Sequence, residues 1–285
     1  MNCFQLIKSV LDEIYVQIPG SDEEKDQLIT KKIDYLYDRY RNLLEQQEPI
    51  NYQDAATRFA YIYKYVPFHA NIMYNVIKGS KELQALFTRE KLRITCLGGG
   101  PGSDLLGILK YCEEADRYPN ITFTLLDSVE GWAESWEDVG DKLSGNIRIN
   151  SVFQRLNVTQ PDSWASKAKY LNANIFTMMY FASEVYSAPG QAVDFFNNLF
   201  SHIPSDSYVV FIDNNSTDFI NYFEQFIPSN GNFVVNRQKT KMGIQDASEE
   251  KTDLGKYYQK FHMQGKGRPK LTADIVIHIC HKVGS

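Results

Sequence analysis

The spacing of apolar residues changes near residue 90, and this change divides the chain into an N-terminal and a C-terminal part. Up to residue 78, apolar residues recur every three or four positions, which predicts amphipathic helices. We expect a break at Pro67, because proline lacks the N–H group that a helix interior requires. The first 90 residues are therefore predicted to be all-helical. The expected helices span 3–17, 22–45, 51–65 and 68–78.

Beyond residue 90, short apolar runs alternate with helical patterns. Such alternation predicts an α/β fold with a mostly parallel sheet and right-handed crossovers. The last two runs have no clear helix between them, so those two strands can pair antiparallel. The expected strands span 92–97, 121–127, 147–153, 173–179, 208–213, 233–237 and 273–282. The expected helices between them span 103–117, 130–143, 189–202 and 217–226.

The segment that follows the first expected strand is rich in glycine, with Gly98, Gly99, Gly100 and Gly102 close together. Glycine lets a backbone approach a ligand closely, and the helix that follows would aim its free N–H groups there. Asp127 ends the next expected strand, where an acid holds a ribose in doubly wound folds. Together these features predict a site for a nucleoside-containing cofactor.

The spacing of these glycines separates two classes of cofactor. The dinucleotide fingerprint G-x-G-x-x-G requires a third glycine where this chain has Ser103, which disfavours a nicotinamide-dependent oxidoreductase. The spacing Gly98-x-Gly100-x-Gly102 resembles motif I of the class I S-adenosylmethionine-dependent methyltransferases, a seven-stranded relative of the Rossmann fold. The resemblance implies a Rossmann-like methyltransferase domain with helices on both faces of its sheet. That domain would span 91–285 and follow a helical region or lid over 1–90.

The resemblance also implies roles for residues of this chain. The loop over 97–102 would wrap the methionine part of the cofactor. Asp127, with Ser128 beside it, would bind the two ribose hydroxyls. Asn157 follows the third expected strand, where its side-chain oxygen would accept a hydrogen bond from the adenine amino group. An ordinary place in a turn is the alternative for Asn157.

The loop after the fourth expected strand would lie beneath the transferable methyl group. It lacks the Asp/Asn-Pro-Pro-aromatic motif of enzymes that methylate nucleic-acid amino groups, which counts against that activity. Tyr180 could pack on the sulfonium and contribute to the cofactor site. Tyr180, Glu184 and His69 are candidates for handling the substrate. Core packing is the alternative for Tyr180 and His69, and an acidic helix start for Glu184.

The helical segment over 58–69 mixes aromatic and basic side chains. Many methyltransferases of this class use a preceding helix as a lid over the cofactor. Arg58 would then pair with the cofactor carboxylate. A packed aromatic helix with a surface arginine is the alternative interpretation.

Composition adds limits on the class of protein. The chain has 285 residues, of which 43% are hydrophobic, and this suits a sizeable core. It contains neither an apolar run long enough to cross a membrane nor the features of a signal peptide, so no membrane association is expected. The four cysteines lack the spacing of a metal site, so no bound metal is expected. Reduced core thiols predict a cytoplasmic or nuclear protein.

The charge is unevenly distributed along the chain. The net charge is −5, which argues against general coating of nucleic acid. The stretch 237–270 nevertheless holds nine Lys or Arg and four acids, a net charge of +5. An anionic substrate or partner could bind there, and a solvated loop is the alternative.

The resemblance implies transfer of the sulfonium methyl group by in-line displacement, with S-adenosylhomocysteine as the product. Alignment of the two reactants supplies much of such a rate enhancement, so few catalytic residues are needed. The acceptor could be a small molecule, a protein or an RNA. A catalytically silent S-adenosylmethionine sensor that acts through a protein partner needs the same cofactor motif, and it is the alternative function.

Overall fold

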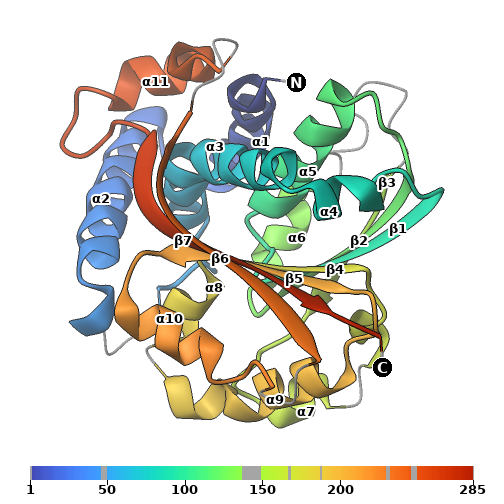
Figure 1. The fold of residues 1–285 in the computed structure, drawn as a ribbon. Helices are drawn as coiled ribbons and strands as arrows, with labels where there is room; N and C mark the ends of the chain where they lie inside the picture. The colour runs from blue at the N-terminus through green and yellow to red at the C-terminus, as the bar shows by residue number, and fades with distance from the viewer. Residues whose placement is uncertain are drawn as a thin grey trace.

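A mixed sheet of seven strands crosses the centre of the molecule in the computed structural model (Figure 1). The structure describes residues 2–45, 50–136, 149–165, 168–186, 188–228, 232–244 and 249–284. The strand order is β3-β2-β1-β4-β5-β7-β6. The strands are β1 Lys91–Leu97, β2 Asn120–Asp127, β3 Ile149–Arg155, β4 Ile175–Met179, β5 Tyr208–Asn214, β6 Phe233–Gly243 and β7 Thr272–Lys282.

The pairing of the strands confirms the expected fold class. Strands β1 to β5 are parallel to their neighbours, and β7 pairs antiparallel with both β5 and β6. The order reverses between β1 and β4, whose carboxyl ends therefore meet at a topological switch point. Ligands of open α/β sheets bind at such a point.

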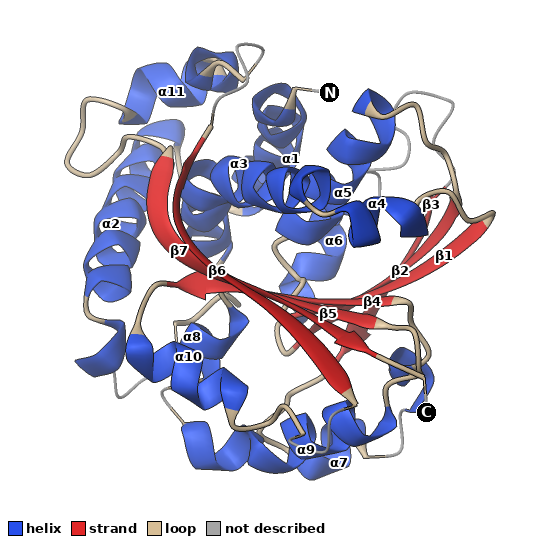
Figure 2. Ribbon diagram, viewed as in Figure 1, coloured by secondary structure: helices blue, strands red, loops and turns tan. Residues whose placement is uncertain are grey.

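Helices cover both faces of this sheet, as predicted (Figure 2). On one face lie α1 Cys3–Gln17, α3 Ala55–Gly79, α4 Lys81–Leu86, α5 Ser103–Glu114 and α6 Ala133–Trp136. On the other lie α7 Pro161–Trp164, α8 Phe181–Val185, α9 Val193–His202 and α10 Thr217–Glu224. Helices α2 Asp22–Arg41 and α11 Lys256–Phe261 lie at one end. Short 3-10 turns span Leu43–Glu45, Glu130–Trp132, Ala168–Leu171, Pro189–Ala192 and Lys251–Leu254. No helix within these described ranges is both long and apolar enough to cross a bilayer.

Helix α3 runs through Pro67 without interruption, so the predicted break there is wrong. A proline in a helix interior costs about 3 kcal/mol or more. Almost all of α3 is buried, and it contacts α1, α2 and α5. Burial of its apolar surface offsets the missing hydrogen bond, and Asn71 Nδ2 donates to the Pro67 carbonyl at 2.9 Å.

The connection between the last two strands also differs from the prediction. Helix α11 lies between β6 and β7, where no helix is expected from the sequence. This stretch is rich in lysine, which obscures its helical period, but Tyr257 and Phe261 are fully buried against Phe59. Of the helix expected over 130–143, the described part is a 3-10 turn followed by α6, and residues 137–143 lie outside the described residues.

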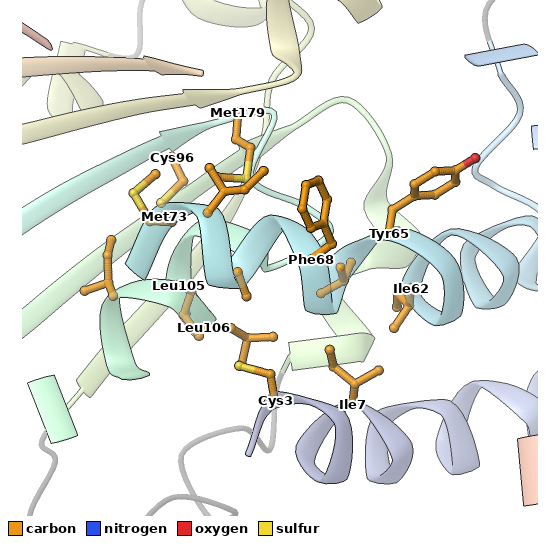
Figure 3. Packing of buried hydrophobic residues seen from close by; sticks show 14 of the residues in the cluster. Cys3, Ile7, Ile62, Tyr65, Phe68, Met73, Cys96, Leu105, Leu106 and Met179 are labelled. Carbon is orange, nitrogen blue, oxygen red and sulfur yellow. The ribbon is translucent and has the colours of Figure 1, made fainter. Parts of the chain in front are cut away.

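The N-terminal helices and the sheet share one hydrophobic core. In Figure 3, Met73 of α3 lies near Cys96 of β1 and Met179 of β4. Leu106 of α5 lies between α3 and Cys3 of α1. The position of α3 is therefore set by contacts on both of its sides.

A buried ion pair joins the connection before β7 to this core. Lys110 Nζ of α5 lies 2.7 Å from Glu249 Oε1, and both side chains are almost completely buried. Lys110 also donates to Asn71 Oδ1 of α3 at 2.7 Å, and both Glu249 oxygens accept from the Cys3 N–H at the start of α1. These bonds connect three helices and the segment at Glu249.

We expect Glu249→Ala to lower the free energy of unfolding by about 3–5 kcal/mol, because it leaves the Lys110 ammonium buried without its partner. Urea unfolding followed by circular dichroism measures the change. The matched control is Glu250→Ala, which removes an exposed neighbouring carboxylate and should change stability by less than about 0.5 kcal/mol. Equal effects of the two variants would contradict the assigned role of the ion pair.

Candidate functional site

A cleft of about 550 Å³ lies at the carboxyl ends of β1 to β4. The loops after these four strands form most of its wall, and Ile50, Tyr52 and Tyr61 complete it from the N-terminal region. This is the place where the switch-point rule puts a ligand. Of the residues predicted from sequence to bind or act, the cleft brings together Gly98, Asp127, Ser128, Asn157, Tyr180 and Glu184.

At its four glycine positions, the loop after β1 (the glycine loop) lies too close to neighbouring atoms to accommodate a Cβ atom. Gly98 and Pro101 line the cleft, and Gly98 has a φ of +67°. A Cβ on Gly98 would lie 2.4 Å from the Phe181 ring, and one on Gly100 would lie 2.3 Å from Trp132 Cδ1. Gly99, Gly100 and Gly102 are absent from the described lining of the cleft. A Cβ on Gly99 would lie 2.4 Å from the Cys96 Cβ. A Cβ on Gly102 would lie 2.2 Å from the Trp136 ring.

Asp127 is fixed at the cleft by backbone donors. Its carboxylate accepts from the N–H of Gly100 at 3.2 Å and from the N–H of Val129 at 2.9 Å. Burial raises the pKa of Asp127 to about 6, although these N–H groups act in the opposite direction. Ser128, next in the chain, lines the cleft and is exposed. The carboxylate therefore has a defined orientation before any ligand binds.

Asn157 lines the cleft in the loop after β3, next to the end of β2, and also forms a local turn. Its Oδ1 accepts from Thr159 N at 3.0 Å and from Thr159 Oγ1 at 2.8 Å. These two bonds use both lone pairs of the oxygen that was expected to accept from adenine. Leu156 and Val158 of the same loop supply apolar walls. The geometry therefore favours a turn-forming role for the Asn157 side-chain oxygen.

Tyr180 and His69 lie together beneath the cleft. Their rings stack with centroids 4.2 Å apart, and Tyr180 adopts a left-handed backbone conformation with φ of 55°. His69 is buried and does not line the cleft, and this burial holds the pKa of its imidazole well below its usual value. A neutral imidazole therefore supports Tyr180 from behind, whereas Tyr180 itself reaches the cleft.

Glu184 lies in the cleft wall, one helical turn beyond Tyr180. Its Oε1 accepts a short hydrogen bond from Tyr40 Oη and a longer one, of 3.4 Å, from Tyr52 Oη. The Tyr52 hydroxyl also lies within hydrogen-bonding distance of Tyr40 Oη, so its one proton is shared between that oxygen and Glu184 Oε1. Burial raises the pKa of Glu184 to about 7, and the bond from Tyr40 opposes this shift. The tyrosine hydroxyls thus fix the orientation of the Glu184 side chain in the cleft wall.

Arg58 does not reach the cleft, which corrects the expectation that it pairs with the cofactor carboxylate. Its Nη1 donates to the carbonyl oxygens of Tyr52 and Gln53 at 3.0 and 2.8 Å, and Nη2 donates to Gln17 Oε1 at 3.2 Å. The side chain is 5% exposed. Arg58 instead holds the segment that carries Tyr52, because α3 buries it against that segment.

Aromatic residues that the sequence did not identify as site residues form much of the wall. Tyr52, Tyr61 and Trp132 line the cleft, and Tyr40 contacts Glu184 from behind. Tyr52 and Tyr61 pack edge to face, with ring centroids 5.5 Å apart. The density of tyrosines between positions 35 and 65 was the available signal. It could not show which rings face the sheet.

No protein-family model and no curated protein sequence matches this chain. Solved structures do match, at low similarity. A methyltransferase from Pyrococcus furiosus has 11% identity, covers 75% of this chain and 83% of its own, and gives a TM-score of 0.45. An S-adenosylmethionine-dependent methyltransferase from Methanosarcina mazei has 10% identity, coverage of 71% and 98%, and a TM-score of 0.43. An rRNA methylase from Streptococcus thermophilus has 6% identity, coverage of 75% and 94%, and a TM-score of 0.40.

The raised pKa of Glu184 predicts a dependence of stability on pH. Between its usual value of 4.5 and about 7, the carboxyl is ionised in the unfolded chain and protonated in the native one. Its contribution to stability therefore falls as pH rises through this window and is absent above pH 7.

We expect the difference in free energy of unfolding between Glu184→Gln and the native chain to change in favour of the variant from pH 5 to pH 8. The change should be at most about 3 kcal/mol. Urea unfolding at the two pH values measures this change. The control is Glu90→Gln, which removes an exposed carboxylate that is not part of the described cleft lining. A difference that is the same at both pH values for Glu184→Gln would show that its pKa is not raised.

Proposed function

We propose that this protein is an S-adenosylmethionine-dependent methyltransferase. The observation that carries the proposal is the cleft at the switch point, where the glycine loop and the Asp127 carboxylate face the same space. A nucleoside with an attached amino-acid chain fits this combination, because it needs both a hydroxyl acceptor and a close backbone surface. The sheet order and its antiparallel closing strand agree with this assignment.

The residues have separable roles in the proposed complex. Asp127 would accept hydrogen bonds from the two ribose hydroxyls, and Gly98 would allow the methionine part to lie against the backbone. Leu156 and Val158 would enclose the adenine ring. When bound, the cofactor supplies an activated methyl group on a positive sulfur. Tyr180 and the adjacent Phe181 would give that cation an aromatic wall.

Calorimetry with S-adenosylmethionine and with S-adenosylhomocysteine tests the proposal. We expect both to bind the native chain, and Asp127→Ala to bind neither measurably. Asp127→Asn keeps the shape of the side chain and should weaken binding by at least about 10-fold, because each hydrogen bond to a charged group contributes about 1.5–3 kcal/mol.

The matched control for this measurement is Asp162→Asn, which changes an exposed carboxylate at the start of α7, away from the cleft lining. It should leave affinity unchanged. Thermal unfolding of each variant establishes that it is folded. Absence of binding by the folded native chain would refute the proposed function.

A further inference from the structure

The charge of the cleft restricts the acceptor that it can take. Among the described residues that line the cleft, Asp127 and Glu184 are acidic, and none is Lys, Arg or His. An anionic acceptor would meet two carboxylates and no cationic side chain among these described lining residues, and Lys270 Nζ lies 5.0 Å from the Tyr180 ring centroid, outside the lining. A cationic acceptor would meet opposite charge, which favours both encounter and binding.

Glu184 lies in α8, directly after β4, whereas the proposed ribose acid Asp127 ends β2, and the two carboxylates are close enough to interact. Phe181, one turn before it in α8, packs against Gly98 of the glycine loop. Glu184 contacts Tyr52, whose hydroxyl donates to its Oε1 at 3.4 Å, whereas Leu156 and Val158 of the proposed adenine pocket come from the loop after β3. Its carboxylate therefore belongs to the part of the cleft wall formed by the C-terminal end of α8 and the N-terminal region, to which the proposed cofactor complex assigns no contact.

The tyrosines around Glu184 suit a positively charged group. Tyr52 and Tyr61 present aromatic surface to the cleft, and a cation is attracted to the face of such a ring. The hydroxyls of Tyr40 and Tyr52 hold one carboxylate oxygen of Glu184. A carboxylate has about four lone-pair sites, so the hydrogen bonds that Glu184 makes within the protein do not prevent it from also accepting from a ligand N–H.

We propose that the methyl acceptor is an amine, and that Glu184 binds its ammonium form and removes the proton before methyl transfer. This inference rests on the proposed function. The proton moves from the ammonium nitrogen to the Glu184 carboxylate, which frees the nitrogen lone pair. The C–N bond then forms as the S–C bond breaks, and the electron pair of the broken bond remains on sulfur. General-base assistance of this kind contributes typically about 10²–10⁴-fold to a rate.

Binding of matched probes to the protein saturated with S-adenosylhomocysteine tests the charge preference. The pairs are 2-phenylethylamine with 2-phenylethanol, butylamine with butanol, and N-acetyl-lysine amide with N-acetyl-norleucine amide. The first two pairs represent a small-molecule amine, and the third represents a protein lysine. We expect at least one amine to bind 10-fold or more tightly than its neutral partner. No preference in any pair would overturn the inference.

The variant Glu184→Gln separates the acceptor role from a cofactor role. We expect it to remove the preference for the amine and to leave the affinity for S-adenosylhomocysteine within about two-fold. With S-adenosylmethionine present, we expect its methylation of the preferred amine to be at least about 100-fold slower. Glu90→Gln should match the native chain in all three measurements.

A loss of S-adenosylhomocysteine affinity in Glu184→Gln as large as the loss for the amine would place Glu184 in the cofactor site and overturn the inference. Failure of the native chain to bind S-adenosylhomocysteine at the first step would refute the proposed function instead. The two failures are therefore distinguishable.

Discussion

The close contact between α3 and α5 is the constraint on which the rest of the structure depends. Gly107 of α5 lies so near α3 that a Cβ there would be 2.4 Å from the Ala70 carbonyl oxygen. One turn further along α5, Lys110 reaches Asn71 of α3 and Glu249. Helix α5 begins at the glycine loop, and α3 carries Tyr61 into the cleft. The packing of α3 against α5 therefore sets the distance between Tyr61 and the glycine loop, which lie on two sides of the cleft.

Local sequence signals were enough to predict the sheet and one half of the site. Apolar runs mark the strands, and the glycine spacing followed by Asp127 marks the loops at the switch point, because each signal is confined to a few neighbouring residues. Tyr40, Tyr52 and Glu184 form a single cluster although they come from three separate parts of the chain. No local pattern encodes such a contact. Pro67 was misjudged for a related reason, since tertiary burial outweighs a local preference.

The distribution of charge in space also differs from its distribution in sequence. The stretch 237–270 has a net charge of +5, yet part of it lies against acidic residues of the first two helices. Lys256 Nζ is 3.0 Å from Asp12 Oδ1, and Lys260 Nζ is 2.6 Å from Asp26 Oδ2. Arg237, Lys239 and Lys241 lie exposed on the edge strand β6, where charge hinders pairing with another chain. An anionic partner at this stretch stays a prediction, separate from the acidic cleft.

Glu249 differs from the two cleft acids, Asp127 and Glu184, in the hydrogen-bond donors that its carboxylate receives. Glu249 receives the Lys110 ammonium and a backbone N–H, and it holds helices together. Backbone N–H groups donate to Asp127, and the hydroxyls of Tyr40 and Tyr52 donate to Glu184. Burial raises the pKa values of these two acids to about 6 and about 7. Neutral donors orient a carboxylate without cancelling its charge, so the fold gives up stability at neutral pH to keep two oriented acids facing the cleft. Ribose hydroxyls and an ammonium group are ligands that such acids can bind.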